Sequence, residues 1–234
     1  MRNTLINISI TRKVALSLAI LMSFCLVFTV ACGSNAQAPS SAVPTWKIGD
    51  TWTVRSSVNG SEITSVTTVT GQEIHNGIDC YTLQMNSTPS RGISTMTLQV
   101  DKTTLDVVGM EMTGSMDGAD FTVTANASYD YSVKPYPLSV GKTWTYTENT
   151  TTTTLVMGQT QTETETYSYN YKVASVENIT VPAGTFECFK VVQYNSSTNA
   201  VLDTQWATDR MNDVKEIAGD GGVTSELVSY SLSK

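Results

Sequence analysis

Histidine is almost absent from this sequence, since His75 is the only one in 234 residues. A Ser-His-Asp triad would have to use it, and zinc sites need clusters of histidine, cysteine and carboxylate. Charged residues are also scarce, at 15%, and the 14 basic residues are outnumbered by 21 acidic ones. Because an acidic surface repels phosphate groups, this composition argues against nucleic-acid binding.

No pattern for a catalytic, metal or cofactor site emerges from the rest of the chain. His75 and Cys80 lie five residues apart across a predicted turn, but no hydrolase context such as Gly-x-Ser-x-Gly is present. Asp79 and Glu187 are interpreted as exposed strand charges. Residues 219–222 (GDGG) lack the lysine and the helix of a phosphate-binding loop. We therefore expect no enzyme activity, no cofactor and no metal.

The N-terminus has the pattern of an export signal. Residues 14–31 are uncharged and largely apolar, follow Arg12 and Lys13, and end in Thr-Val-Ala before Cys32. A basic start, an apolar middle and small residues at the end are typical of a secretory signal peptide. The junction resembles the lipobox of bacterial lipoproteins, in which the cysteine is acylated, although Thr29 stands where leucine is usual. We predict a signal peptide over 1–31 and lipid attachment at Cys32.

Two alternatives for the N-terminus stay open. Residues 36–38 (AQA) are a plausible ordinary cleavage site, which would give a secreted protein. The apolar run is also just long enough to stay as an uncleaved membrane helix, for which about 17–25 residues are needed. All three interpretations place the rest of the chain outside the cytoplasm, with a flexible tether over 32–45. The exported part then carries a net charge of −10.

Two of the four cysteines, Cys80 and Cys188, lie in the exported part beyond the anchor. An oxidising compartment permits a disulfide between them. The alternative is two separate buried thiols, because the two positions match each other in the repeat described below. Matched positions meet only near the axis that relates the two copies, with Cα atoms within about 7 Å.

The exported part is predicted to be all-β. Apolar and polar residues alternate through 51–54, 81–85, 95–100 and 121–133, the pattern of antiparallel strands with one buried face. No stretch has a 3.6-residue stripe. Asn-Gly at 59–60 and at 76–77 indicates hairpin turns. We expect curved antiparallel sheet, as a half-barrel or a barrel-like fold.

The sequence repeats itself once. Residues 48–54 (IGDTWTV) match 140–146 (VGKTWTY), residues 78–83 (IDCYTL) match 186–191 (FECFKV), and Asp-Val recurs at 106–107 and 213–214. The three matches occur in the same order, which indicates two copies of one β-unit. We place the first unit at 46–133 and the second at 134–234.

The second unit carries extra polar residues at 150–154 and 159–166, where threonine recurs with glutamine and glutamate between. We expect a hairpin that turns near Gly158 and projects past the core. Downstream, Tyr167, Tyr169 and Tyr171 share one strand face. They are either core packing or a binding face that stacks on a sugar or a partner surface.

The second unit resembles the TapB-like family and related β-rich domains of unknown function in envelope lipoproteins. The resemblance rests on residues 137–146 (PLSVGKTWTY) and 181–191 (VPAGTFECFKV), with Trp206 and Val214-Lys215 in the later positions of the pattern. Such domains are distantly similar to the LolA and LolB lipoprotein carriers, which are curved half-barrels that hold acyl chains. The resemblance implies no catalytic residues.

Two functions follow as hypotheses. The first is an exported, lipid-anchored, non-catalytic binding or structural module whose partner is a glycan, an envelope protein or a small molecule. The second is a carrier of an apolar acyl or isoprenoid ligand inside the curved sheet, for which the methionines offer an adaptable lining. These methionines are Met85, Met96, Met110 and Met112.

Overall fold

The computed structural model describes residues 42–58, 60–90, 92–208, 210–211, 213–219 and 222–233. The predicted signal peptide, Cys32 and most of the tether lie outside these residues. Within the described part the regular structure consists of antiparallel β-strands without an α-helix, as the alternation predicts. Accordingly, no described segment forms a helix long and apolar enough to span a bilayer.

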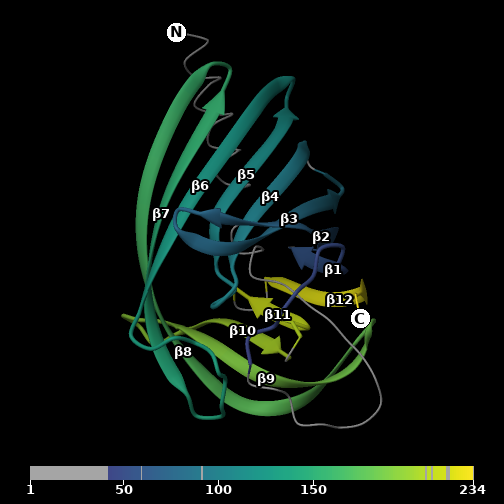
Figure 1. The fold of residues 1–234 in the computed structure, drawn as a ribbon, viewed down its shortest axis with the longest axis vertical. Coiled ribbons are helices and arrows are strands. Elements are labelled where there is room, and N and C mark those ends of the chain that lie inside the picture. The colour runs from purple at the N-terminus through teal and green to yellow at the C-terminus, as the bar shows by residue number, and fades with distance from the viewer. Residues whose placement is uncertain are drawn as a thin grey trace.

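The described strands follow one another along the chain, joined mostly by short turns. They are β1 (Thr51–Val58), β2 (Ser61–His75), β3 (Ile78–Thr88), β4 (Ile93–Asp101), β5 (Val107–Met116), β6 (Ala119–Tyr131), β7 (Thr143–Val156), β8 (Gln159–Val181), β9 (Gly184–Asn195), β10 (Val201–Ala207), β11 (Lys215–Ala218) and β12 (Val223–Ser231). Figure 1 shows them coiling around a common interior.

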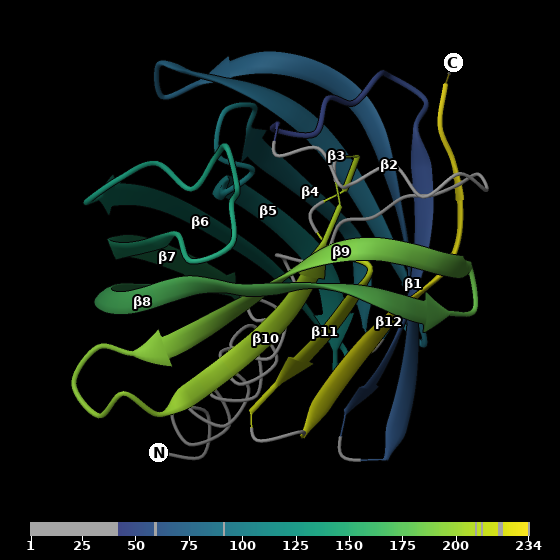
Figure 2. The same cartoon turned by 90° about the horizontal axis from the view of Figure 1, so that it is seen from below.

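The strands close into one barrel, because the last strand pairs with the first. β12 runs antiparallel to β1 from Thr51↔Ser231 to Val58↔Val223. The hydroxyls of Ser56 and Ser225 form a hydrogen bond of 2.9 Å across this pair. Figure 2 shows β10, β11 and β12 side by side, next to β1. The fold is thus a closed barrel, not an open half-barrel.

The matched segments of the two units occupy matched places in the barrel. Gly49 and Gly141, both with positive φ, precede β1 and β7. Their backbone N–H groups donate to the carbonyls of Val69 and Val173, at 2.8 and 2.9 Å. Each of these valines is followed by a register shift in its strand. The boundary proposed at residue 134 falls in the connection between β6 and β7.

The end of the β2–β3 hairpin crosses the barrel wall. Figure 1 shows it passing over the ribbons of β4 to β6. The His75 ring lies 3.0 Å from the Asn126 side-chain oxygen on β6, as a hydrogen-bonded pair. A Cβ at Gly109, on β5 beneath the crossing, would come within 2.6 Å of the His75 ring. Glycine at this position therefore permits the close approach of the two layers.

The walls formed by the first unit are filled with apolar side chains. Met85, Met96 and Met112 lie opposite one another on β3, β4 and β5, and all three are buried. Trp52 on β1 is buried and packs against Trp46, with ring centroids 5.2 Å apart. The methionines thus serve as core residues, with Leu83, Leu98 and Val123 among them.

We predict that Leu98→Ala destabilises the barrel by about 2–5 kcal/mol, because it leaves a cavity in a core that packs on all sides. Leu98 is 0% exposed. The matched control is Leu155→Ala on β7, where the side chain is 43% exposed, and it should cost less than about 1 kcal/mol. Urea denaturation followed by tryptophan fluorescence measures both. Equal losses would show that this wall is not the core.

Candidate functional site

The tyrosines predicted as a stripe on β8 belong to a larger aromatic wall across β6, β7 and β8. In one cross-strand row Tyr131, Tyr146 and Tyr169 are directly opposite one another. In the next row Glu148 lies between Tyr129 and Tyr167. Opposite residues in a sheet share a face, so all six side chains point to the same side of the wall.

Ring contacts hold this wall together. Tyr146 is at its centre, with ring centroids 5.5 Å from Tyr129 and from Tyr131, and 5.6 Å from Tyr169. Tyr171 stacks on Trp144 at 5.2 Å with an interplanar angle of 7°. Offset and edge contacts of this kind stabilise aromatic clusters by about 0.5–1.5 kcal/mol each. The wall is therefore well suited to keeping its rings in fixed positions.

A cavity of about 480 Å³ lies against this wall, inside the barrel. Its lining comes from every strand from β5 to β11. Tyr167 and Tyr169 line it, whereas Tyr171 is packed deeper, against Trp144. Its size falls within the 300–1,000 Å³ usual for small-molecule sites. The predicted tyrosine face is thus divided: two members face the cavity, and the third is core.

One side of the cavity is open because β8 extends beyond β9. The pairing of β8 with β9 begins at Tyr169↔Asn195. The part of β8 before Tyr169 pairs with β7 alone, along the long β7–β8 hairpin in Figure 1. This hairpin turns at Met157 and Gly158, as predicted from the sequence. Its polar residues 159–166 are exposed.

The wall opposite the tyrosines is acidic. Asp203 on β10 and Glu216 on β11 both line the cavity, and Asp203 is only 6% exposed. Asp203 reaches this position at a register shift in β10, between Val201 and Asp203. The Gln205 side-chain amide donates to Asp203 Oδ2 at 2.7 Å. The Asp203 and Glu216 carboxyls are also hydrogen-bonded to each other, which requires a proton between them.

Burial raises the pKa of Asp203 to about 7. Burial, and then the nearby Asp203 charge, raises the pKa of Glu216 well above its usual range. Asp213, just before β11, is 0% exposed, and neither of its carboxylate oxygens has a partner among the described residues. Its pKa is also raised well above the usual range, by burial first and then by the charges of Glu216 and Asp203. These carboxyls are therefore weak acids.

This acidic group is not among the site residues predicted from the sequence. The signal was present in residues 201–207 (VLDTQWA), where strand spacing places the polar Asp203 and Gln205 on one face with Ala207. A strand whose inward positions are polar indicates a wet interior. The inward direction itself, however, depends on barrel closure.

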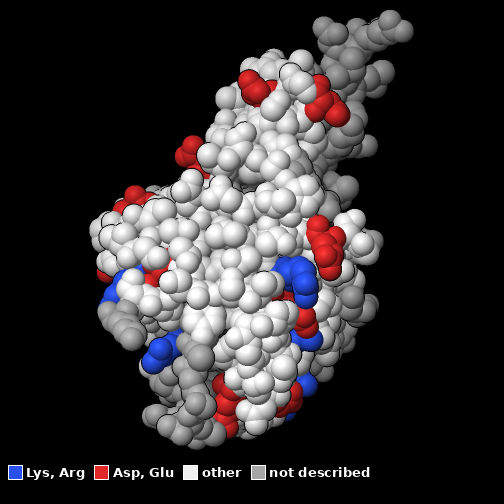
Figure 3. Space-filling view, turned by 90° about the vertical axis from the view of Figure 1, so that its right-hand side faces the viewer, with Lys and Arg blue, Asp and Glu red and all other residues white. Residues whose placement is uncertain are grey.

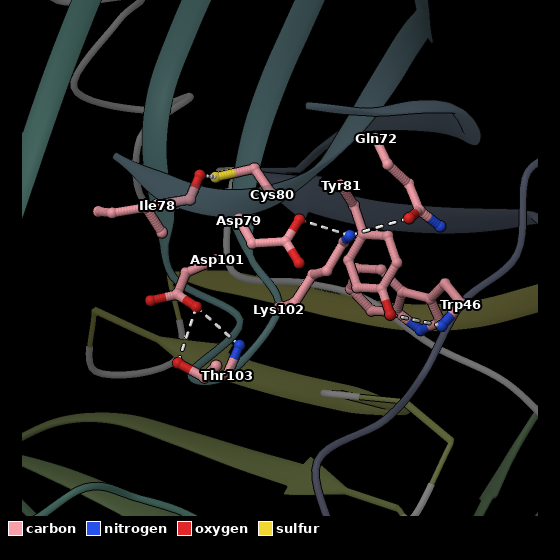
Figure 4. Close-up of polar contacts among 9 residues, drawn as sticks. All are labelled: Trp46, Gln72, Ile78, Asp79, Cys80, Tyr81, Asp101, Lys102 and Thr103. Atoms are coloured by element: carbon pink, nitrogen blue, oxygen red, sulfur yellow. Dashed lines mark hydrogen bonds and ion pairs between the residues drawn. The ribbon is translucent and has the colours of Figure 1, made fainter. Parts of the chain in front are cut away.

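Cys80 and His75 do not form a catalytic pair. The Cys80 thiol donates to the Ile78 carbonyl at 3.4 Å, as Figure 4 shows, and burial raises its pKa to about 11. A thiol of that kind is a poor nucleophile at neutral pH. The His75 ring is hydrogen-bonded to Asn126 instead.

The Asp79 carboxylate forms an ion pair of 2.6 Å with Lys102. The Lys102 ammonium also donates to Gln72 and lies over the Tyr81 ring, 5.4 Å from its centroid. Figure 4 shows Lys102 held among these three side chains. This group joins β2, β3 and the end of β4 and has a structural role. Asp79 is therefore a surface charge with a partner, in agreement with the interpretation from the sequence.

The two cysteines are both free and buried, which is the second of the alternatives that the sequence left open. Like Cys80, Cys188 donates to the carbonyl two residues earlier, at 3.6 Å to Phe186. Burial raises the pKa of Cys188 to about 12. The disulfide between Cys80 and Cys188 does not form in this structure.

Among the described residues, no group of three or more His, Cys, Asp or Glu side chains is arranged to hold a metal ion. The outer surface is sparsely charged on the face that Figure 3 shows. Acidic and basic groups are scattered there, mainly toward the edges and the lower end.

The DUF3108-like family model matches residues 54–223, which include strands of both units. This chain belongs to that family. DUF denotes a domain of unknown function, so membership assigns no ligand or reaction. The match runs from within β1 to the first residue of β12, and it agrees with the expectation of a domain of unknown function. No curated protein matches the chain.

Two solved structures are similar to the chain at low identity. One is a candidate exported protein with a YmcC-like fold from Bacteroides fragilis, at 11% identity and a TM-score of 0.37. The other is a candidate lipoprotein from Parabacteroides distasonis, at 10% identity and a TM-score of 0.34. Each alignment covers 83% of this chain and 100% of the other. These matches do not confirm the resemblance to TapB-like proteins or to the LolA and LolB carriers.

We predict that the barrel becomes less stable as the pH rises from about 4 to about 7. The unfolded chain ionises Asp203 near the ordinary aspartate pKa of 3.8, whereas the folded chain holds the proton until about pH 7. Unfolding then releases protons, so the free energy of unfolding falls with rising pH. Asp203→Asn should flatten this slope in urea titrations at a series of pH values.

The matched control for this prediction is Asp130→Asn. Asp130 is exposed on the outward side of β6, between Tyr129 and Tyr131. This variant should keep the wild-type slope. If Asp203→Asn has the same slope as the wild type, Asp203 is not a buried acid in the folded protein.

Proposed function

We propose that this chain is an exported, lipid-anchored binding module, without catalytic activity, that takes a small molecule into the barrel cavity. The observation that carries the proposal is the cavity itself: about 480 Å³, lined by seven consecutive strands and open beside β8. Stacked rings keep its tyrosine wall in place. A preformed site of this kind binds without a large ordering cost.

The non-catalytic part of this proposal is supported by the chemistry of the nucleophiles. Both thiols have raised pKa values caused by burial. His75 lies on the outer side of the wall, hydrogen-bonded to Asn126. Cys80, Cys188 and His75 are all absent from the lining of the cavity. Chemical conversion of a bound ligand during incubation would contradict a purely binding role.

The apolar-carrier hypothesis has less support from the geometry. Of the four methionines that suggested it, only Met110 lines the cavity. All four methionines belong to the core cluster, and Met85, Met96 and Met112 do not line the cavity. The cavity combines polar and apolar surface, which suits a ligand with both characters better than an acyl chain.

Location outside the cytoplasm is proposed from the sequence of residues 1–31 and from Cys32. Metabolic labelling with a fatty-acid probe should mark the wild-type protein, and Cys32→Ser should abolish the label because it removes the acylated sulfur. Gel fluorescence of the membrane fraction measures this. Equal labelling of the two proteins would show that Cys32 is not the anchor.

The ligand site is tested by blocking the cavity. Ala127 on β6 lines it, and Ala127→Trp would fill part of the volume. Native mass spectrometry of the protein in mild detergent should show a bound mass that Ala127→Trp loses and Ser128→Trp retains. Ser128 is the matched control because it is exposed on the outward side of the same strand. A wild-type protein without any bound mass, or a ligand that both variants retain, would contradict the proposal.

A further inference from the structure

The cavity is unusual in the sign of its charges. Four carboxyl side chains line it, and the described lining residues include no Lys, Arg or His. They come from both sides of the cavity, with Glu148 and Glu165 on β7 and β8, and Asp203 and Glu216 on β10 and β11. Carboxyls facing the same space repel one another when they are ionised. The site therefore lacks a positive charge of its own.

Asp203 is buried without a cation beside it. It is 94% buried, since only 6% of it is exposed, and its side-chain partners are the Gln205 amide and the Glu216 carboxyl. Burial raises its pKa to about 7, because no cation among the described residues compensates the loss of solvation. A positively charged donor placed in the cavity would stabilise the ionised form of Asp203.

The aromatic wall offers a second kind of attraction to a cation. Glu148 stands in register between Tyr129 and Tyr167, and Tyr146 and Tyr169 follow in the next row. All five residues line the cavity. The face of a tyrosine ring attracts a cation within about 6 Å, more strongly where water is excluded. The Glu148 carboxylate and the tyrosine rings beside it would thus attract the same cation.

We propose that the cavity binds a protonated amine carried on an apolar or cyclic skeleton. This rests on the proposed function, that of a small-molecule binding module. A protonated amine would donate N–H hydrogen bonds to the Asp203 carboxylate, which a quaternary ammonium cannot do. The skeleton would lie against the apolar part of the lining, to which Val107, Met110, Ala125 and Leu202 belong.

Other ligand classes fit the cavity less well. A neutral sugar would stack on the tyrosines but would leave the carboxyls without a counter-charge. An anion would be repelled by those carboxyls that are ionised. A bare metal ion needs several ligands converging at about 2–2.6 Å, and the described residues provide no such group of three or more.

The test uses full-length protein in mild detergent and three probes of one skeleton. These are phenethylamine, its trimethylammonium analogue and the neutral 2-phenylethanol. Isothermal titration at neutral pH should show phenethylamine binding at least about tenfold more tightly than either analogue, since a hydrogen bond to a charged group is at stake. Asp203→Asn should weaken the affinity for phenethylamine by about tenfold or more. Asp130 is an exposed carboxylate outside the cavity, so Asp130→Asn should change this affinity by less than about twofold.

The outcomes separate this inference from the proposed function. If the neutral probe binds as tightly as the amine, or Asp203→Asn binds the amine as the wild type does, the amine assignment is wrong. The same holds if the amine does not bind at millimolar concentration. The cavity would still be a ligand site if Ala127→Trp removes the mass seen by native mass spectrometry. Circular dichroism of Asp203→Asn confirms that a loss of binding does not come from misfolding.

Discussion

The pairing of β1 with β12 is the interaction on which the whole arrangement depends. Without it, the sheet would stay open and leave β1 and β12 as unpaired edge strands, and an exposed edge invites aggregation. With it, the inward faces of all twelve strands are enclosed together. Every inward side chain must then either pack or line a space, because a closed sheet has no second apolar layer to cover it. One side of the interior is packed with apolar side chains and the other contains the cavity. This difference arises because the two halves of the chain supply different inward residues.

The sequence matches between the two halves of the chain make this division easier to understand. Matched backbone contacts at Gly49 and Gly141 show that the two units use the same local geometry. Their inward residues differ, since the first unit supplies most of the methionines and leucines of the core, and the second supplies most of the tyrosines and carboxyls. Asp106 and Asp213 precede matched strands, and both are buried. The Tyr131 hydroxyl donates to Asp106, whereas Asp213 has no partner among the described residues.

Much of the fold could be predicted from alternation and turn residues, because both act locally. The strands at 51–54, 81–85 and 95–100 and the turn at Gly158 are of this kind. Closure could not be predicted, because the pairing of Thr51 with Ser231 joins opposite ends of the chain and leaves no local signal. The tyrosine stripe on β8 could be predicted from the spacing of its residues. Whether these side chains point into the barrel or outward depends on how the barrel closes. Asp203 was missed because its inward position follows a register shift that alternation does not reveal.

The single-sided pairing of the first part of β8 has a consequence for exchange between the cavity and solvent. Residues 159–168 are hydrogen-bonded to β7 and to no other described strand. Bending of this hairpin would widen the opening beside Tyr167 without breaking any interstrand hydrogen bond of the closed ring. The stiffness of the two-stranded β7–β8 hairpin would then control the passage of a molecule, while the closed barrel stays intact. The glutamates along that ribbon also discourage another strand from pairing with its free edge.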